Sequence, residues 1–389
     1  MEIPASYKGR EQAFVKHTLL RTYLERLFMI VGQHEKRICY VDCFAGPWQE
    51  GGNDLQDTSI AISLEIMRKC RDGLRKIGKE VHFRALYVEK DEAAFARLET
   101  FLKEKASSEI ETRPEKGEFY DLRSEILGWC GNKDFVFFFI DPKGWKQAVE
   151  IPTLRPLLQR SNSEYLINFM YDFLLRTHTW DAVKNEMKEV FGKVPETSEM
   201  TPDQKEAYLL KMYHEHLKGA QPSAGPKARS VHVKVLYPYK DRTLYALVYL
   251  TRHPKGIVEF MEASEDLDWV QRVVRTQARQ DRKVSKTGQS EMFPANVGLE
   301  DKKERIDISV VKEYWLSKLS STPRRFGIME LADMLEETGW FIGDFQGAFG
   351  ELEEEGRVRN LDSKRKRRTS FVHFEENNGR GEQLVKILL

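Results

Sequence analysis

Two acidic residues that end apolar runs are the groups best placed for chemistry in this chain. Asp42 ends the run ICYVD at residues 38–42, and Asp141 ends the run FVFFFID at residues 135–141. Buried strands that finish in a polar group and a tight turn form the ligand crevice of an open α/β sheet. A carboxylate at that edge accepts hydrogen bonds from hydroxyl and amino groups of a ligand. The two acids therefore predict a site built from distant parts of the chain.

The bend after Asp42 is a candidate cofactor-binding loop. A glycine there allows the backbone to approach a ligand closely, and the acid anchors polar groups, which is typical of a nucleoside cofactor site. The alternative is an ordinary turn between a strand and a helix, since the pattern G-x-G-x-x-G is absent. The residues assigned to this loop are Asp42, Phe44, Ala45, Gly46 and Pro47.

Two further segments complete the predicted cofactor site. Glu89 ends the apolar run near residue 90, the position that holds ribose hydroxyls in Rossmann-like folds. Glu118 and Phe119 follow a glycine, where the acid is expected to hydrogen-bond to an adenine and the ring to stack on it. A solvated strand-end acid and a helix-capping acid are the structural alternatives for the two glutamates.

The segment DPKGW at residues 141–145 is the candidate reacting centre. It is similar to the acid-Pro-Pro-aromatic loop of methyltransferases that modify exocyclic amines, and a rigid acceptor there orients the nitrogen lone pair. Asp141 and Pro142 supply that acceptor, and Lys143 is assigned to a phosphate or to general-base chemistry. Trp145 is assigned to stacking on a base of a nucleic acid. A tight turn with a structural role only is the alternative.

The elements that must position these residues alternate between helix and strand. Apolar spacing predicts helices over 11–32, 58–71 and 91–104, and apolar runs predict strands at 38–44, 81–90, 135–141 and 164–170. Two β-rich segments, 231–239 and 243–251, predict a hairpin. The predicted class is α/β, with a Rossmann-like S-adenosylmethionine (SAM) methyltransferase fold over residues 1–285, in which a mostly parallel sheet closes on an antiparallel hairpin.

Residues 286–304 are polar with little periodicity and are predicted to be a linker. The remaining residues, 305–389, are predicted to form a small α+β winged helix-turn-helix domain. Its expected helices cover 308–319, 324–339 and 341–358, and its expected hairpin joins RVRNL to FVHFE through a basic turn.

Charge is distributed unevenly, although the net charge of the chain is only +1. Residues 356–370 carry seven Lys and Arg and one Asp, a net charge of +6. Five consecutive basic residues usually serve to bind phosphates, with a solvated loop as the alternative. The residues assigned to nucleic acid in this segment are Arg357, Lys364, Arg365, Lys366, Arg367 and Arg368. A second basic set recurs at helical spacing between residues 272 and 286.

Composition narrows the class of protein. Apolar residues make up 41% and charged residues 32% of the 389 residues, which is typical of a globular protein with a charged surface. No apolar stretch reaches the roughly 18 residues that a membrane span needs, and the first residues lack the apolar core of a secretory signal. The four cysteines show no zinc-ligand spacing. A cytoplasmic protein with reduced thiols and no metal is expected.

Four segments together resemble one known family. They are KH-x-L-L-x-x-Y-L at 16–24, YVDCFAGP at 40–47, FIDPKGW at 139–145 and EYLINFMYDFLLR at 164–176. The chain resembles the three-Cys-motif partner (TcmP) family over residues 10 to 280, with the appended winged helix of some members. The resemblance implies a SAM-methyltransferase fold, with Asp42 and Gly46 at the SAM loop, Glu89 as the ribose acid and Asp141 at the reacting centre. It also implies a partner that carries three cysteines and resembles radical-SAM enzymes.

Two functions are therefore predicted. The first is methyl transfer from SAM to nucleic acid, most plausibly to a base nitrogen, with the winged helix delivering the substrate. The second is a catalytically inactive scaffold that binds the three-cysteine partner and nucleic acid, which Lys143 and the glycine-poor loop favour. An oxidoreductase that uses a dinucleotide is disfavoured because the phosphate-binding glycines are missing.

Overall fold

The computed structural model describes residues 4, 7, 9–46, 58–105, 109–144, 147–170, 183–287, 306–363 and 370–387, of which 285–287 are described by their backbone only. Residues 2–252 form one compact unit and residues 253–389 the other. They are called the N-terminal unit and the C-terminal unit. The division falls earlier than the expected boundary at residue 285.

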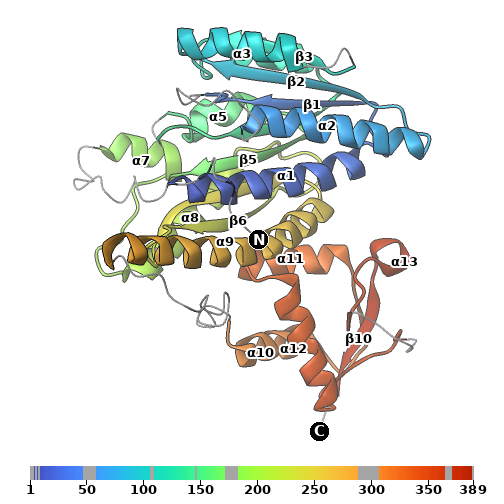
Figure 1. The fold of residues 1–389 in the computed structure, drawn as a ribbon. Helices are drawn as coiled ribbons and strands as arrows, with labels where there is room; N and C mark the ends of the chain where they lie inside the picture. Colours follow the sequence, from blue (N-terminus) through green and yellow to red (C-terminus); the bar gives the residue numbers. More distant parts are fainter. Residues whose placement is uncertain are drawn as a thin grey trace. The chain divides into compact units, whose positions relative to one another are not determined.

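The N-terminal unit is built on a seven-stranded sheet (Figure 1). Its strand order is β3-β2-β1-β4-β5-β7-β6, with β1 to β5 parallel and β7 antiparallel to both of its neighbours. This is the predicted Rossmann-like methyltransferase fold, a mostly parallel sheet that closes on an antiparallel hairpin. The strands are β1 Arg37–Asp42, β2 His82–Glu89, β3 Glu111–Lys116, β4 Phe135–Ile140, β5 Ser163–Phe169, β6 Arg229–Leu236 and β7 Thr243–Thr251.

Helices cover both faces of this sheet. Helices α1 (Glu11–Val31) and α2 (Ser59–Lys76) pack together on one face, and α3 (Glu92–Lys105) lies along β2 and β3 (Figure 1). The other face is covered by α4 (Arg123–Cys130), α5 (Ile151–Leu158), α7 (Lys184–Phe191) and α8 (Pro202–Gly219), whose apolar residues join the core cluster of the strands. Burial on both faces explains why β1 and β4 have nearly continuous apolar sequences.

The C-terminal unit combines helices with a three-stranded antiparallel sheet of order β8-β10-β9. Helix α9 (Pro254–Thr287) belongs to this unit because it packs against α11 and α12. The elements that follow are α10 Ile308–Lys318, β8 Arg324–Phe326, α11 Ile328–Thr338, α12 Ile342–Glu354, β9 Val358–Asn360, α13 Glu376–Gly379 and β10 Glu382–Lys386.

Two expectations for the C-terminal unit are wrong. The helix expected from residue 324 begins at Ile328, because residues 324–326 form strand β8 instead. The segment FVHFE is not a strand, and the partner of β9 is β10. The backbone of the FVHFE segment is satisfied by side chains: Gln346 bonds to the N–H and C=O of residue 372, and Glu382 accepts from the N–H of His373. A segment bonded in this way does not need a ladder.

Candidate functional site

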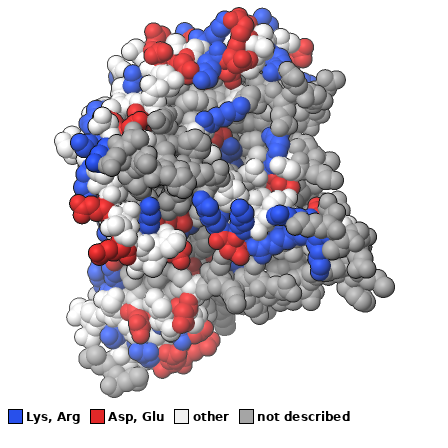
Figure 2. Space-filling model, turned by 90° about the vertical axis from the view of Figure 1, so that its left-hand side faces the viewer, with Lys and Arg blue, Asp and Glu red and all other residues white. Residues whose placement is uncertain are grey.

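Acidic side chains gather at the edge of the sheet where the parallel strands end. Asp42 ends β1, Glu89 ends β2 and Asp141 follows β4, and these three strands are neighbours in the order β2-β1-β4. Asn168 lies near the end of the next strand, β5. Figure 2 views the molecule from this side and shows Lys and Arg side chains on this face. The predicted convergence of the strand-end acids is therefore present.

Asp141 is held from two sides. Lys16 of α1 forms a close ion pair with its Oδ2, and Asn168 donates from Nδ2 to its Oδ1 at 2.6 Å. The two charged side chains are 14% and 18% exposed, so the pair is largely buried and still partly accessible to a bound molecule. Burial by itself would raise the pKa of Asp141, but the ammonium of Lys16 and the two hydrogen bonds hold that pKa below its ordinary value. Asp141 is therefore a carboxylate at neutral pH.

Helix α1 also carries His17, the residue after Lys16. The Nδ1 of His17 lies 3.0 Å from the hydroxyl of the buried Tyr7. Burial, and then the charge of Lys16, lower the pKa of His17 to about 3, so this imidazole is neutral at pH 7. The pair KH appeared in the sequence only as part of a family-like motif. Local sequence patterns do not relate Lys16 to an acid 125 residues away. A Lys and a His near the start of an amphipathic helix do, however, mark that helix end as a candidate part of the site.

Asp42 organises the first loop. It is fully buried and accepts hydrogen bonds from the N–H of Phe44 at 3.2 Å and from the hydroxyl of Ser59 at 2.6 Å. Burial raises its pKa to about 7, against the opposing effect of these two donors. Ser59 is the first residue of α2, so its hydrogen bond to Asp42 links the end of β1 to the start of that helix. In the structure its contacts are with the protein itself, and contact with a cofactor remains a prediction.

The other predicted cofactor residues lie around the same loop. Glu89 is buried and accepts from the N–H of Asp91 at 2.7 Å through one oxygen. Glu118 forms an ion pair with Lys90 at 3.0 Å. Phe119 is buried with its ring centre 5.5 Å from that of Phe44. The structure thus brings the first loop, the end of β2 and the segment after β3 together, as a nucleoside site requires.

The remaining loop residues are described in part. Ala45 donates its N–H to Val88 at 2.8 Å, which fixes the loop against β2, and Gly46 is the last described residue of that loop. Pro142 is buried, and Lys143 beside it is exposed. Gly144 has a φ of +127°, a conformation that favours glycine.

Several predicted residues lie outside the described ranges. They are Pro47, Trp145, Lys364, Arg365, Lys366, Arg367 and Arg368. Arg357 is described: it precedes β9 and lies 3.6 Å from Glu355. On α9, Arg275 is buried, so the basic residues of that helix do not share one exposed face.

One buried polar atom at the site has no partner among the described residues. Asn168 is 3% exposed, and its Oδ1 makes no hydrogen bond there. Because a buried acceptor without a partner is costly, this oxygen beside Asp141 is suited to receive an N–H or O–H from a bound molecule. The residues therefore fit a ligand with a donor group, such as an amine. Among the described residues, no group of three His, Cys, Asp or Glu side chains is placed to hold a metal.

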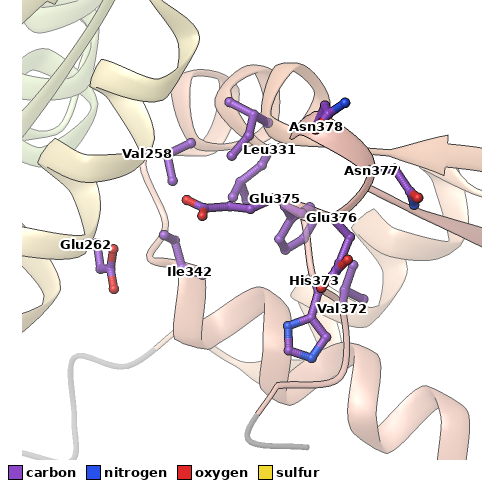
Figure 3. Close-up of a pocket in the computed structure, with 12 residues that line it drawn as sticks. Val258, Glu262, Leu331, Ile342, Val372, His373, Glu375, Glu376, Asn377 and Asn378 are labelled. Atoms are coloured by element: carbon purple, nitrogen blue, oxygen red, sulfur yellow. The ribbon is translucent and has the colours of Figure 1, made fainter. Parts of the chain in front are cut away.

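A pocket lies within the C-terminal unit (Figure 3). It has a volume of about 580 Å³, and its lining comes from α9, α11, α12 and residues 372–378. Three of the lining side chains are acids, Glu262, Glu375 and Glu376. None of the predicted site residues lines it, and its negative charge disfavours phosphate.

Comparisons with known proteins show only a weak likeness of fold. No family model matches the sequence, and no curated protein matches it. A solved structure of protein LPL1258 from Legionella pneumophila, of family DUF519, has a TM-score of 0.37 and 10% identity, over 64% of this chain and 91% of that one. An O-methyltransferase from Bacillus cereus in complex with SAH has a TM-score of 0.32 and 12% identity, over 60% and 80%. The fold assignment therefore rests on the strand order. No described helix is both long enough and apolar enough to cross a membrane.

Proposed function

We propose that this protein is a SAM-dependent methyltransferase that acts on a base nitrogen of nucleic acid. The observation that carries the proposal is the group formed by Asp141, Lys16 and Asn168 at the carboxyl ends of β4 and β5, next to the loop that Asp42 organises. In a doubly covered parallel sheet, ligands bind in the crevice outside these strand ends. The cofactor is assigned to the side of β1 and β2, and the acceptor base to the side of β4 and β5.

The residues of the chain would position an amine rather than activate it strongly. Bound SAM supplies a methyl group on a positively charged sulfur. Asp141 stays ionised and accepts an N–H of the substrate, while the unpartnered Oδ1 of Asn168 accepts a second one. Two acceptors on one amine fix the direction of its lone pair, which is how orientation lowers a barrier. The proton lost after transfer passes to Asp141 or to water.

Lys16 fixes the acceptor in this scheme. Its ammonium holds one oxygen of Asp141 and compensates its charge, so the carboxylate keeps one rotamer without becoming protonated. Glu89 is assigned to the ribose hydroxyls because one of its two oxygens is already fixed by the N–H of Asp91 and the residue lies at the end of β2. Phe44 and Phe119 would form the apolar wall against the adenine.

The nucleic-acid substrate is proposed from the basic segment, and the protein partner from the resemblance to the TcmP family. Helices α10, α11 and α12 and the three-stranded sheet of the C-terminal unit are assigned to a winged helix, and the +6 segment at residues 356–370 is proposed to bind nucleic acid. A three-cysteine protein that resembles radical-SAM enzymes is the proposed protein partner. Pull-down of that partner is the measurement that tests it.

The test of the catalytic assignment uses Asp141→Asn, which keeps the size of the side chain, beside Asp141→Ala. Both variants are expected to lose methyl transfer from radiolabelled SAM to total RNA and DNA by about 100-fold or more, because a neutral side chain no longer holds the amine. SAM binding, measured by calorimetric titration, is expected to remain. Glu164→Gln, at the opposite edge of the sheet, is the matched control and should keep its activity.

Two results would overturn the assignment. Full transfer by Asp141→Asn would remove Asp141 from the reacting centre. Absence of SAM binding by the unmodified protein would favour the inactive scaffold instead. Glu89→Ala is expected to weaken SAM binding by about tenfold or more, as expected when a buried hydrogen-bonding group is lost.

A further inference from the structure

The turn between β6 and β7 lies at the same edge of the sheet as Asp141. Strand β7 is antiparallel to β5, so it begins where β5 ends. Tyr245, the third residue of β7, donates its hydroxyl to the backbone of Gln12, one turn before Lys16 on α1. Burial and then the charge of Asp141 raise the pKa of Tyr245, which agrees with this placement. Two residues of strand separate Tyr245 from the turn, so Tyr245 and Arg242 lie roughly 10 Å apart along the chain.

The turn is short, well defined and exposed. The N–H of Tyr237 bonds to the C=O of Arg242 at 3.0 Å and closes it. Its sequence is YPYKDR, in which the three residues at 240–242 are all charged. Tyr239 is 42% exposed, and Lys240 and Arg242 are exposed too. The turn therefore presents part of an aromatic ring at the surface, next to two cations and Asp241.

We propose that this turn is a contact site for single-stranded nucleic acid, with a base stacked on Tyr239 and phosphates on Lys240 and Arg242. The inference rests on the proposed function and extends it, since the turn would hold the nucleotides next to the one at Asp141. Aromatic rings between cations are the arrangement that binds single strands without sequence preference. A duplex would keep its bases stacked inside and could use only the two cations.

The position of the turn suits a nucleic acid whose target base is unpaired. A methyl acceptor inside a duplex is out of reach, so the target must be unpaired or extruded. The exposed ring of Tyr239 at this edge of the sheet gives a neighbouring base a surface to replace its lost stacking. Strands β6 and β7 pair along their whole length, apart from one register shift near Leu236, so the hairpin holds both ends of the turn.

The test measures binding of fluorescent 16-nucleotide single strands and duplexes to the full chain by anisotropy, between 50 and 200 mM salt. Tyr239→Ala is expected to weaken single-strand binding about tenfold, whereas Tyr239→Phe keeps it, because stacking needs only the ring. Lys240→Ala/Arg242→Ala is expected to lower the slope of log K against log salt by about 1.4, from two phosphate contacts. The matched control is Lys76→Ala/Lys79→Ala, two exposed lysines at the other end of the sheet.

The outcomes separate this inference from the function on which it rests. Loss of single-strand affinity with unchanged SAM binding supports the turn as the contact site. Unchanged affinity and slope in both turn variants would overturn it and leave the binding to other segments, such as residues 364–368. Equal losses for single strands and duplexes in Tyr239→Ala would also overturn it, because the ring would then not be stacking on a base. Failure of the unmodified protein to bind SAM would instead count against the proposed function.

Discussion

Helix α1 contacts two carboxyl groups, one partly buried and one buried, and their hydrogen-bonding partners differ in kind. Asp141 lies at the carboxyl edge of the sheet and is paired with Lys16. Glu164 lies near the start of β5 and accepts from three hydroxyls, those of Tyr23 at 3.0 Å, Tyr249 at 2.6 Å and Thr251 at 2.8 Å. Lys16 and Tyr23 are seven residues apart, two helical turns, so the same face of α1 reaches both.

The partners decide the charge state of each group. A cation lowers the pKa of Asp141 against the effect of burial, whereas neutral hydroxyls leave the pKa of Glu164 raised, with burial as the main cause. Asp141 is 18% exposed at its side chain, and Glu164 is 5% exposed as a residue. An ionised group at an open edge is suited to a ligand. The Glu164 carboxyl is buried and both of its oxygens accept hydrogen bonds, so it is suited to fixing the packing of α1 on β5 and β7.

Lys16→Met is expected to have the largest effect on stability, a loss of about 3 kcal/mol at pH 7. Asp141 would remain buried without its cation, so its pKa would rise above the ordinary value. The loss should therefore shrink at pH 4.5, where the carboxyl takes up a proton. The loss of stability in the N-terminal unit is measured by urea unfolding, monitored through the hydrogen exchange of peptides from β4 and β5.

A double variant tests the cause of this loss. Lys16→Met/Asp141→Asn removes both charges and is expected to recover most of the stability, since no buried charge is left unpaired. In the unmodified protein the lowered pKa of Asp141 contributes stability above the unfolded value near 4. That contribution is lost as the pH falls through the folded pKa. An equal loss at both pH values in Lys16→Met would point to packing instead of charge.

The comparison also shows what the sequence could reveal. The acid after β4 was predictable because FVFFFI is an uninterrupted apolar run. Glu164 was hidden inside a run of strand-forming residues, and its three hydroxyl partners come from α1 and β7, 85 to 141 residues away. Local spacing carries no information about such pairs, whereas it does carry the period of a helix or strand.

Elements with an unusual composition were missed for related reasons. Strand β3 has the sequence ETRPEK, which is polar and contains a proline, and only its place at the sheet edge permits this. Helix α5 contains Pro156 within eight residues and was not expected. Strand β8 has three residues, too few for any periodicity. By contrast, α1, α2, β1 and β4 were predictable because each buries a broad apolar face.

Glu164→Gln is expected to increase stability, whereas Lys16→Met is expected to decrease it. A carboxyl whose folded pKa is raised binds its proton more tightly when folded, so stability falls as the pH rises from its unfolded value near 4.5 through the folded pKa. The amide removes this penalty, and the variant is expected to gain about 1 to 2 kcal/mol at pH 8 and little at pH 4. Urea unfolding at the two pH values measures it. A loss of stability at pH 8 would mean that the ionised form of Glu164 is favoured.

Ser59→Ala extends the comparison to another buried carboxyl, that of Asp42, and has the smallest expected effect, about 1 kcal/mol near pH 5. Asp42, with a pKa of about 7, is mostly protonated there, so a neutral hydrogen bond is lost. The loss should grow above pH 7, because the ionised carboxylate then keeps only the N–H of Phe44 as donor. Thr58→Ala, which removes the neighbouring cap of α2, is the matched control: its cost, also about 1 kcal/mol, should not change with pH. A cost of Ser59→Ala that stays constant from pH 5 to 8 would show that Asp42 does not titrate in this range. A constant cost of about 1 kcal/mol would then mean that Asp42 stays protonated, as Glu164 does below its raised pKa, and a larger constant cost that it stays ionised, as Asp141 does.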